Sequence, residues 1–159
     1  MAGGRVGELR RTGSERSLNL NLTNREKGRV GLSMAINYFT LNGYTISLPL
    51  NDTQWYDMVI EKNGKFQTVQ CKCTFTEDSE ISLRSNGGTK GTTYDNVLNH
   101  PELDLLFCVN KDLNCWLIPV IEIIKAGNTK SIKLRTELTI NAHPKLDTTL
   151  YQVQILDRA

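Results

Sequence analysis

Two apolar segments flank an Asn-Gly pair at residues 63–64, and this pattern constrains the fold more than any other part of the chain. Asn-Gly between alternating apolar residues is the strongest short-range indication of a β-hairpin with a two-residue turn. Such a turn pairs Lys62 with Lys65. The same register places Asp57 directly opposite Gln70, with the two Cβ atoms about 4.5–5.5 Å apart.

Three polar side chains share one face of this predicted hairpin. Lys72 lies two residues beyond Gln70, and alternate residues of a strand point to the same side. Asp57, Gln70 and Lys72 are therefore expected to converge. Cys71 and Cys73 point to the other face, into apolar packing.

A carboxylate, an amide and an ammonium on one face suit a particular chemistry. A carboxylate and an amide oxygen can hold a hard divalent cation, with a backbone carbonyl and waters completing its shell. A neighbouring lysine can orient or deprotonate a water, or stabilise the charge that develops on a phosphate. These parts suit metal-assisted phosphodiester hydrolysis. The alternative is an Asp–Lys pair on a solvated sheet face with Gln70 as a neutral neighbour, and these residues alone leave both interpretations open.

A helix is expected before the hairpin. Thr23 and Glu26 have the spacing of a capping box, and Gly43 suits the position after the last helical turn. Residues 44–48 alternate and predict a strand. The apolar stripe of the helix consists of Leu32, Ala35, Ile36 and Phe39.

The second half of the chain adds further elements. Residues 76–101 are polar and glycine-rich and predict a loop. An apolar run at 103–109 predicts a buried strand with a partner at 115–120, and residues 120–126 predict a short helix. One or two more strands are expected in the last thirty residues. A helix followed by mostly antiparallel strands and then mixed elements predicts an α+β or mixed α/β fold.

The chain has 159 residues, of which 39% are apolar and 23% are charged. This size and composition are those of one globular domain. No apolar run approaches the roughly 18 residues of a membrane span. The first residues show no secretory signal, so we expect a cytoplasmic protein without membrane contact.

Cysteine, histidine and tryptophan suggest no separate site. The cysteines lack the paired spacing of a zinc site, so we interpret them as small buried hydrophobes. We assign no ligand role to His100, and we expect Trp55 in the core or at its rim. The four cysteines are Cys71, Cys73, Cys108 and Cys115.

The net charge is only +2, but it is unevenly distributed. Residues 1–30 hold seven Lys and Arg against three Glu, and residues 125–145 hold five against one. The intervening residues 31–124 hold six against eleven acidic residues. Two basic flanks around an acidic centre suit a polyanion-binding protein with a metal site. Ordinary solvated surfaces explain the same distribution, and charge alone does not separate the two.

Asp57 with the segment Val69-Gln70-Cys71-Lys72 resembles the core motif of PD-(D/E)XK nucleases, in a variant with Gln in place of the motif's acidic residue. The resemblance extends over residues 24–120. Within this class of nucleases, the chain is similar to the bacterial group I intron homing endonucleases. Its further segments, in chain order, are Lys27-Gly28-Arg29-Val30-Gly31, Asn42-Gly43-Tyr44, Ser47-Leu48-Pro49, Tyr56-Asp57 and Leu117-Ile118-Pro119.

The resemblance implies a restriction-endonuclease-like core, with a mixed central sheet and flanking helices. It implies a single nuclease domain over residues 23–159. Its core is 24–120, and 121–159 add elements for DNA contact. The resemblance does not reach residues 1–22, whose Gly, Arg, Ser and Asn content predicts a basic flexible arm or an extension added outside the domain.

The resemblance also implies roles for individual residues. Asp57 takes the place of the metal-ligand carboxylate, and Gln70 that of the motif acid at the metal. Lys72 takes the place of the catalytic lysine, and the backbone carbonyl of Cys71 that of a further metal ligand. Members commonly carry a Glu on the first helix where this chain has Leu32. Asp57 is then the sole side-chain carboxylate expected at the metal, so substrate phosphate has to supply more of the coordinating charge.

The implied substrate is double-stranded DNA, and the implied cofactor is Mg²⁺ or another divalent cation such as Mn²⁺. A homo-oligomer, a dimer or a tetramer, is expected because one small domain covers only part of a long site. Basic side chains supply phosphate contacts. The candidates are Arg25, Lys27, Arg29, Arg84, Lys90, Lys130, Lys133 and Arg135.

Two alternatives to a homing endonuclease remain at this point. One is a different PD-(D/E)XK nuclease, such as a Holliday-junction resolvase or a restriction enzyme. The other is a DNA-binding module with a weakened active site, which the apolar Leu32 and the neutral Gln70 motivate.

Overall fold

The computed structural model describes residues 21–51, 53–86 and 94–155. In these ranges six strands form a mixed central sheet: β1 (Thr45–Ser47), β2 (Met58–Lys62), β3 (Lys65–Cys73), β7 (Leu105–Val109), β8 (Cys115–Pro119) and β10 (Gln152–Val153). Their order across the sheet is β1-β2-β3-β7-β8-β10, with β3 and β7 parallel and the other neighbours antiparallel. The predicted mixed α/β architecture is confirmed.

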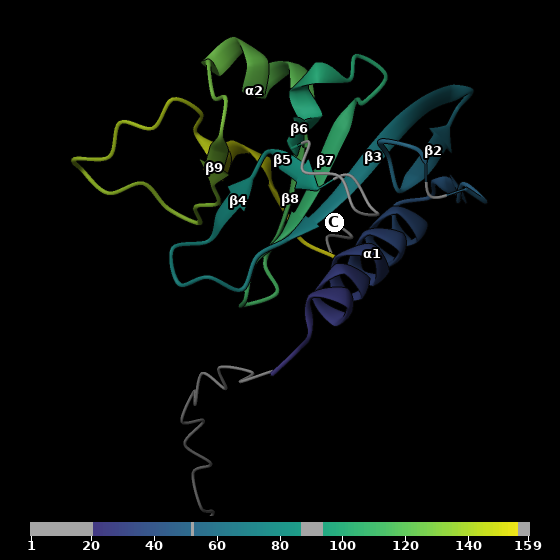
Figure 1. Cartoon of the computed structure of the whole chain (residues 1–159), viewed down its shortest axis with the longest axis horizontal. Helices are drawn as coiled ribbons and strands as arrows, with labels where there is room; N and C mark the ends of the chain where they lie inside the picture. The colour runs from purple at the N-terminus through teal and green to yellow at the C-terminus, as the bar shows by residue number, and fades with distance from the viewer. Residues whose placement is uncertain (1–20, 52, 87–93, 156–159) are drawn as a thin grey trace, which may run out of the picture.

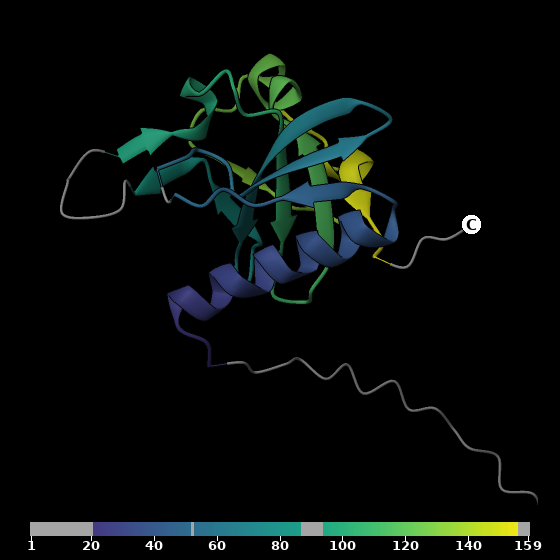
Figure 2. The same ribbon diagram turned by 90° about the vertical axis from the view of Figure 1, so that its right-hand side faces the viewer.

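The remaining elements flank this sheet. They are α1 (Asn24–Leu41), α2 (Val120–Ala126), the 3₁₀ turns η1 (Val97–Asn99) and η2 (Thr148–Tyr151), and the short strands β4 (Glu80–Ser82), β5 (Arg84–Asn86), β6 (Tyr94–Asn96) and β9 (Ser131–Lys133). Strand β4 pairs with β9, and β5 pairs with β6. Figures 1 and 2 show α1 along one face of the sheet, with α2 and the short strand pairs on the other side.

The predicted hairpin forms with the predicted register. Lys62 pairs with Lys65, and Asn63 and Gly64 have φ values of 54° and 78°, as a type I′ turn requires. The ladder begins only at Met58, so Asp57 lies one residue beyond it. The predicted ladder position of Asp57 directly opposite Gln70 is therefore not formed.

The parallel pairing of β3 with β7 has a local anchor. Asp104 accepts a hydrogen bond from the Thr68 backbone N–H at 2.9 Å, and its own N–H donates to the Thr68 hydroxyl at 3.0 Å. The first ladder pair, Val69 with Leu105, follows directly. This reciprocal contact joins positions 36 residues apart in the sequence and sets the register of the two central strands.

Helix α1 begins and ends as predicted. Thr23 and Glu26 form both hydrogen bonds of a capping box, and Gly43 adopts a φ of 79° after the helix. Gly31 lies against the C-terminal end of β3, where a Cβ atom on it would lie 3.5 Å from Cys73 Cβ and 3.9 Å from the Lys72 carbonyl. Gly31 is buried at this contact between the helix and the strand that carries Lys72.

Apolar side chains fill both sides of the sheet. Under α1 lie the buried Ala35 and Phe39 of the predicted stripe, with Leu32 and Ile36 half-buried beside them. The other layer, under α2 and the short strand pairs, consists of Ile81, Leu83, Val97, Leu103, Leu106, Cys108, Trp116, Ile118, Val120, Ile123, Ile132 and Leu134.

The predicted loop at 76–101 is wrong in part. It contains β4, β5, β6 and η1, because backbone pairing with β9 and within the β5–β6 pair compensates for its weak apolar pattern. The four cysteines carry free thiols, two of them buried. None of the helices in the described ranges is long and apolar enough to span a membrane.

Candidate functional site

The three polar side chains of the hairpin lie on the sheet face away from α1. Val69 is buried in the layer under α1, so strand alternation directs Gln70 and Lys72 to the opposite face. Lys72 pairs across the backbone with the buried Cys108 of β7, and Gln70 is half-buried. The structure thus places Gln70 and Lys72 as the sequence predicts.

Asp57 reaches this site through a departure from ladder geometry. Its backbone N–H donates to the Val69 carbonyl at 2.8 Å, and its Oδ2 accepts from the Cys71 N–H at 2.6 Å. The carboxylate therefore takes the position of a backbone partner for β3. Burial raises the pKa of Asp57, against the opposing effects of this hydrogen bond and of the Lys72 charge.

The Cys71 carbonyl lies on the same side of β3 as the Asp57 carboxylate. A residue in a strand directs its N–H and its C=O to one side, as the paired bonds of an antiparallel ladder show. Because the Cys71 N–H donates to Asp57, its carbonyl faces the same edge. A carboxylate and a carbonyl oxygen at one edge are ligands that hard divalent cations accept.

The Lys72 side chain contacts β5. Its Nζ donates to the Arg84 carbonyl of β5 at 3.2 Å. Burial lowers the pKa of Lys72, while Cys108 and Asp57 act in the opposite direction. A carboxylate and an ammonium that both lose solvation near each other interact more strongly than on an open surface. Shifted pKa values of two neighbouring, oppositely charged groups are typical of functional sites.

Leu32 belongs to the apolar layer between α1 and the sheet, where it is half-buried. It adds no oxygen ligand to the site. In the described ranges, no group of three or more His, Cys, Asp and Glu side chains could together hold a metal ion. An ion at this site would therefore rest on the Asp57 carboxylate, backbone and amide oxygens, and groups from outside the chain.

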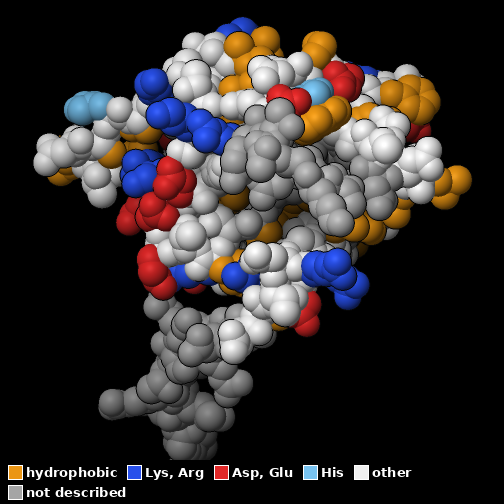
Figure 3. All heavy atoms as spheres, in the orientation of Figure 1, with side chains coloured by type: hydrophobic (Ala, Val, Ile, Leu, Met, Phe, Trp, Pro, Cys, Tyr) orange, Lys and Arg blue, Asp and Glu red, His pale blue; other side chains and the backbone are white. Residues whose placement is uncertain are grey.

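The expected DNA-contacting residues lie on separate elements. Arg25 and Arg29 are exposed on α1, Arg84 is exposed on β5, and Lys130 is exposed before β9. Figure 3 shows Lys and Arg side chains along α1 and beside β4 and β9, with acidic side chains near them. Lys90 lies outside the described residues.

The other basic candidates make contacts within the chain. The Lys27 ammonium lies 5.6 Å from the centre of the Phe75 ring, and Lys133 lies 3.8 Å from an oxygen of Asp78. Arg135 follows β9 and is half-buried, and its buried Nε atom has no hydrogen-bond partner among the residues that the structure describes. Strand β9 ends at Lys133, so Arg135 lies beyond the strand that carries Lys133.

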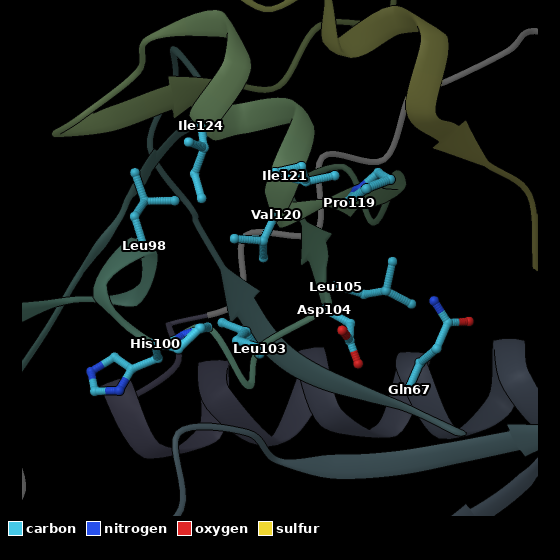
Figure 4. Close-up of a pocket in the computed structure, with 11 residues that line it drawn as sticks. Gln67, Leu98, His100, Leu103, Asp104, Leu105, Pro119, Val120, Ile121 and Ile124 are labelled. Atoms are coloured by element: carbon cyan, nitrogen blue, oxygen red, sulfur yellow. The ribbon is translucent and has the colours of Figure 1, made fainter. Parts of the chain in front are cut away.

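Two features near the site have no clear counterpart in the sequence pattern. Trp55 stacks on His100, with ring centres 3.6 Å apart and planes at 15°. His100 also lines a cavity of about 450 Å³. Figure 4 shows His100 and Gln67 at opposite ends of this cavity, which mainly apolar side chains from β7, α2 and η1 line. Asp57, Gln70 and Lys72 do not line this cavity.

The sequence matches one class of protein over most of its length. A family model described as PD-(D/E)XK endonuclease matches residues 22–152. The chain therefore belongs to the PD-(D/E)XK endonuclease family, whose members are nucleases that generally use divalent metals.

A solved structure supports the same fold. The chain is similar to the bacterial homing endonuclease I-Ssp6803I, with a TM-score of 0.58 and 20% sequence identity. The similarity covers 82% of this chain and 87% of that one. No curated protein sequence matches this chain.

Proposed function

We propose that this protein is a divalent-metal-dependent endonuclease that cleaves double-stranded DNA at specific sites, as homing endonucleases do. One observation carries the proposal. The Asp57 carboxylate accepts a hydrogen bond from the Cys71 N–H, on the side of β3 that the Cys71 carbonyl faces, with the half-buried Lys72 side chain nearby. The fold similarity to a bacterial homing endonuclease supports the finer assignment.

The donor set suits a hard cation such as Mg²⁺ or Mn²⁺. The Asp57 carboxylate, the Cys71 carbonyl and the Gln70 amide oxygen would hold the ion, since all are oxygen donors. When bound, such an ion supplies Lewis-acid polarisation of a phosphate oxygen and of a water. With a single carboxylate among these ligands, DNA phosphate contributes the remaining negative charge.

Lys72 acts on the reacting phosphate. Its ammonium neutralises negative charge that develops on a non-bridging oxygen, and partial burial strengthens this interaction. The Arg84 carbonyl fixes the direction of Nζ before substrate binds. Preorganised charge of this kind contributes to the rate rather than to affinity for DNA.

DNA binding rests on basic side chains around the site. Arg25, Arg29 and Lys130 are exposed and suited to phosphate contacts. Arg84 is also exposed, and its own backbone carbonyl accepts the hydrogen bond from Lys72 Nζ. A symmetric dimer or tetramer would supply two such sites, one for each strand of the duplex.

The test is a cleavage assay on a library of random duplex sites with Mg²⁺ or Mn²⁺, followed by the same assay on the selected site. Lys72→Ala should lower the cleavage rate by about 10²-fold or more, because it removes a group that stabilises the transition state. DNA binding should stay within a few fold. Lys65→Ala removes an exposed lysine at the other end of the same strand and is the matched control.

Cleavage by Lys72→Ala at the parent rate would contradict the assignment of this site. A four-way junction offered beside the linear duplex distinguishes a resolvase from a homing or restriction enzyme. A parent chain that binds the duplex and cuts neither DNA would be the weakened binding module. The half-buried, apolar Leu32 and the neutral Gln70 favour that second candidate.

A further inference from the structure

Asp57 lies outside the β2–β3 ladder, so neighbouring residues have to hold the segment that carries it. The β2 ladder begins at Met58, and Asp57 contacts β3 through two hydrogen bonds. Tyr56 packs against the apolar layer under α2. Trp55 is the next residue back, at most about 7 Å along an extended chain from Asp57.

Trp55 belongs to neither apolar layer of the sheet. It is half-buried, and its indole lies flat on the His100 imidazole with 3.6 Å between ring centres. The contact joins positions 45 residues apart in the sequence, and it attaches the segment before β2 to the chain after η1.

His100 is itself held from both edges of its ring. Nε2 lies 2.8 Å from Asp95 Oδ2, and Nδ1 lies 3.3 Å from Glu102 Oε1. Asp95 Oδ1 accepts hydrogen bonds from the Asn99 side chain at 3.0 Å and the Asn96 N–H at 2.7 Å. These contacts fix the ring plane on which the indole stacks.

The strand pair that holds His100 also touches the catalytic lysine. Asp95 lies in β6 and pairs with Ser85 of β5. Its neighbour Arg84 accepts a hydrogen bond from Lys72 Nζ through its carbonyl. The β5–β6 pair is thus connected to Lys72 on one side and, through His100 and Trp55, to the segment of Asp57 on the other.

We propose that Trp55 and His100 are positioning residues, whose stack holds the Asp57 carboxylate where it binds the metal. The inference rests on the proposed function, since it needs a metal at Asp57. Partners that orient a ligand without touching the metal typically change metal affinity by 10–100-fold when removed. Trp55 lies at the rim rather than in a core layer, so its loss acts on the site more than on folding.

The test measures Mn²⁺ binding to the full chain without DNA, by the loss of the free-ion signal in electron paramagnetic resonance. Trp55→Ala should weaken Mn²⁺ binding about tenfold. Trp55→Phe keeps a stacking ring and should bring the affinity back to within about threefold of the parent. Phe66→Ala removes an exposed aromatic ring beside the hairpin turn and should bind Mn²⁺ as the parent does.

Equal Mn²⁺ affinity of Trp55→Ala and the parent would overturn the proposal. So would a loss in Phe66→Ala as large as that in Trp55→Ala, or a Trp55→Phe variant no better than Trp55→Ala. If Trp55→Ala does not fold, Trp55→Leu keeps apolar bulk without the ring. Weak Mn²⁺ binding by Trp55→Leu supports the stack, and parent affinity overturns it.

Asp57→Ala separates this proposal from the proposed function. If the parent binds Mn²⁺ and Asp57→Ala does not, the metal site stands and the Trp55 variants test the stack alone. If the parent binds Mn²⁺ only when a saturating duplex supplies phosphate, all variants are compared with that duplex, and the Mn²⁺ bound by the duplex alone is subtracted. If Asp57→Ala binds Mn²⁺ as well as the parent, or the parent binds none even with the duplex, the metal site at Asp57 fails and the positioning role fails with it.

Discussion

At the scale of single residues, Asp57 combines a structural and a chemical task. Its Oδ2 accepts the Cys71 N–H and so completes the edge of β3 that β2 leaves unpaired. In the proposed function, the same carboxylate would supply the negative charge that a bound cation needs. Because burial raises the pKa of Asp57, its ionised form destabilises the folded chain relative to a neutral side chain.

Asp57→Asn separates the two tasks. An asparagine retains an oxygen that can accept the Cys71 N–H, and it removes a negative charge that is partly desolvated. We expect a Tm equal to or above that of the parent at neutral pH without metal, together with loss of Mn²⁺ binding and of cleavage. A thermal melt and a Mn²⁺ titration check this, with Asp57→Ala as the variant that loses both tasks. A lower Tm for Asp57→Asn than for Asp57→Ala would contradict it.

Leu32 offers a second test at this scale. It packs in the layer under α1, so a carboxylate there loses apolar contact and part of its solvation. We expect Leu32→Glu to destabilise the chain by about 1–3 kcal/mol without tightening Mn²⁺ binding. Leu32→Met keeps the volume and should cost less than about 1.5 kcal/mol. Tighter Mn²⁺ binding by Leu32→Glu at an unchanged Tm would show instead that this helix position reaches the metal.

At the scale of elements, the ends of α1 are specified locally. Glu26 accepts hydrogen bonds from the Thr23 N–H at 2.7 Å and from its hydroxyl at 2.8 Å, and the Glu26 N–H donates back to that hydroxyl. These bonds hold the pKa of Glu26 below its usual value. A capped α1 keeps Gly31 against β3 near Lys72, so the cap also supports the site.

The cap has a pH dependence of known sign. Since the folded-state pKa of Glu26 is lowered, its ionised form stabilises the fold above the unfolded-state pKa, and this is lost as the pH falls through the folded-state value. Glu26→Gln should therefore melt below the parent at pH 7 and converge with it in acid. Thr23→Ala should cost about 1 kcal/mol at pH 7 and less in acid, because its hydroxyl also donates to the ionised Glu26 carboxylate. Thr40→Ala is a control at an exposed position of the same helix. A Glu26→Gln difference that is constant from pH 7 to pH 3 would contradict this.

Elements built from neighbouring residues were predictable from the sequence. The hairpin register follows from a two-residue turn, and the start of α1 follows from Thr23 and Glu26. Their energetics depend on residues within a few positions of each other. The same local pattern placed Gln70 and Lys72 on one face of β3.

Long-range contacts were not predictable in this way. The bond from Lys72 Nζ to the Arg84 carbonyl depends on where the β5–β6 pair docks, and no periodicity encodes that. The stack of Trp55 on His100 likewise joins two loops. Asp57 left the ladder because its side chain replaces a backbone partner, which a register calculation does not anticipate.

At the scale of the whole molecule, the exposed basic side chains of the described residues lie on several elements rather than in one patch. Arg25 and Arg29 lie on α1, Arg84 lies on β5, and Lys130 precedes β9, so these cations come from three separate parts of the fold. Figure 3 shows acidic side chains near the basic groups. Non-specific affinity is therefore expected to need many weak phosphate contacts, including any from residues 1–22, which hold four arginines.

The salt dependence of DNA binding tests the contribution of those four arginines. Each neutralised phosphate contributes about −0.9 to the slope of log affinity against log salt. Replacing Arg5, Arg10, Arg11 and Arg16 by Gln in the full chain should flatten that slope by about 0.9 for each phosphate that is no longer neutralised. The cleavage rate at saturating protein should not change, since Lys72 and Asp57 remain.

A matched control removes charge elsewhere, at the hairpin turn. Lys62→Gln with Lys65→Gln neutralises two cations that lie at the opposite end of β3 from Lys72. That variant should keep the parent slope, because the site needs DNA at the Lys72 end of the strand. If the four-arginine variant also keeps the parent slope, the first 22 residues make no phosphate contact. The dispersed cations of α1, β5 and the segment before β9 would then have to account for the whole electrostatic part of DNA binding.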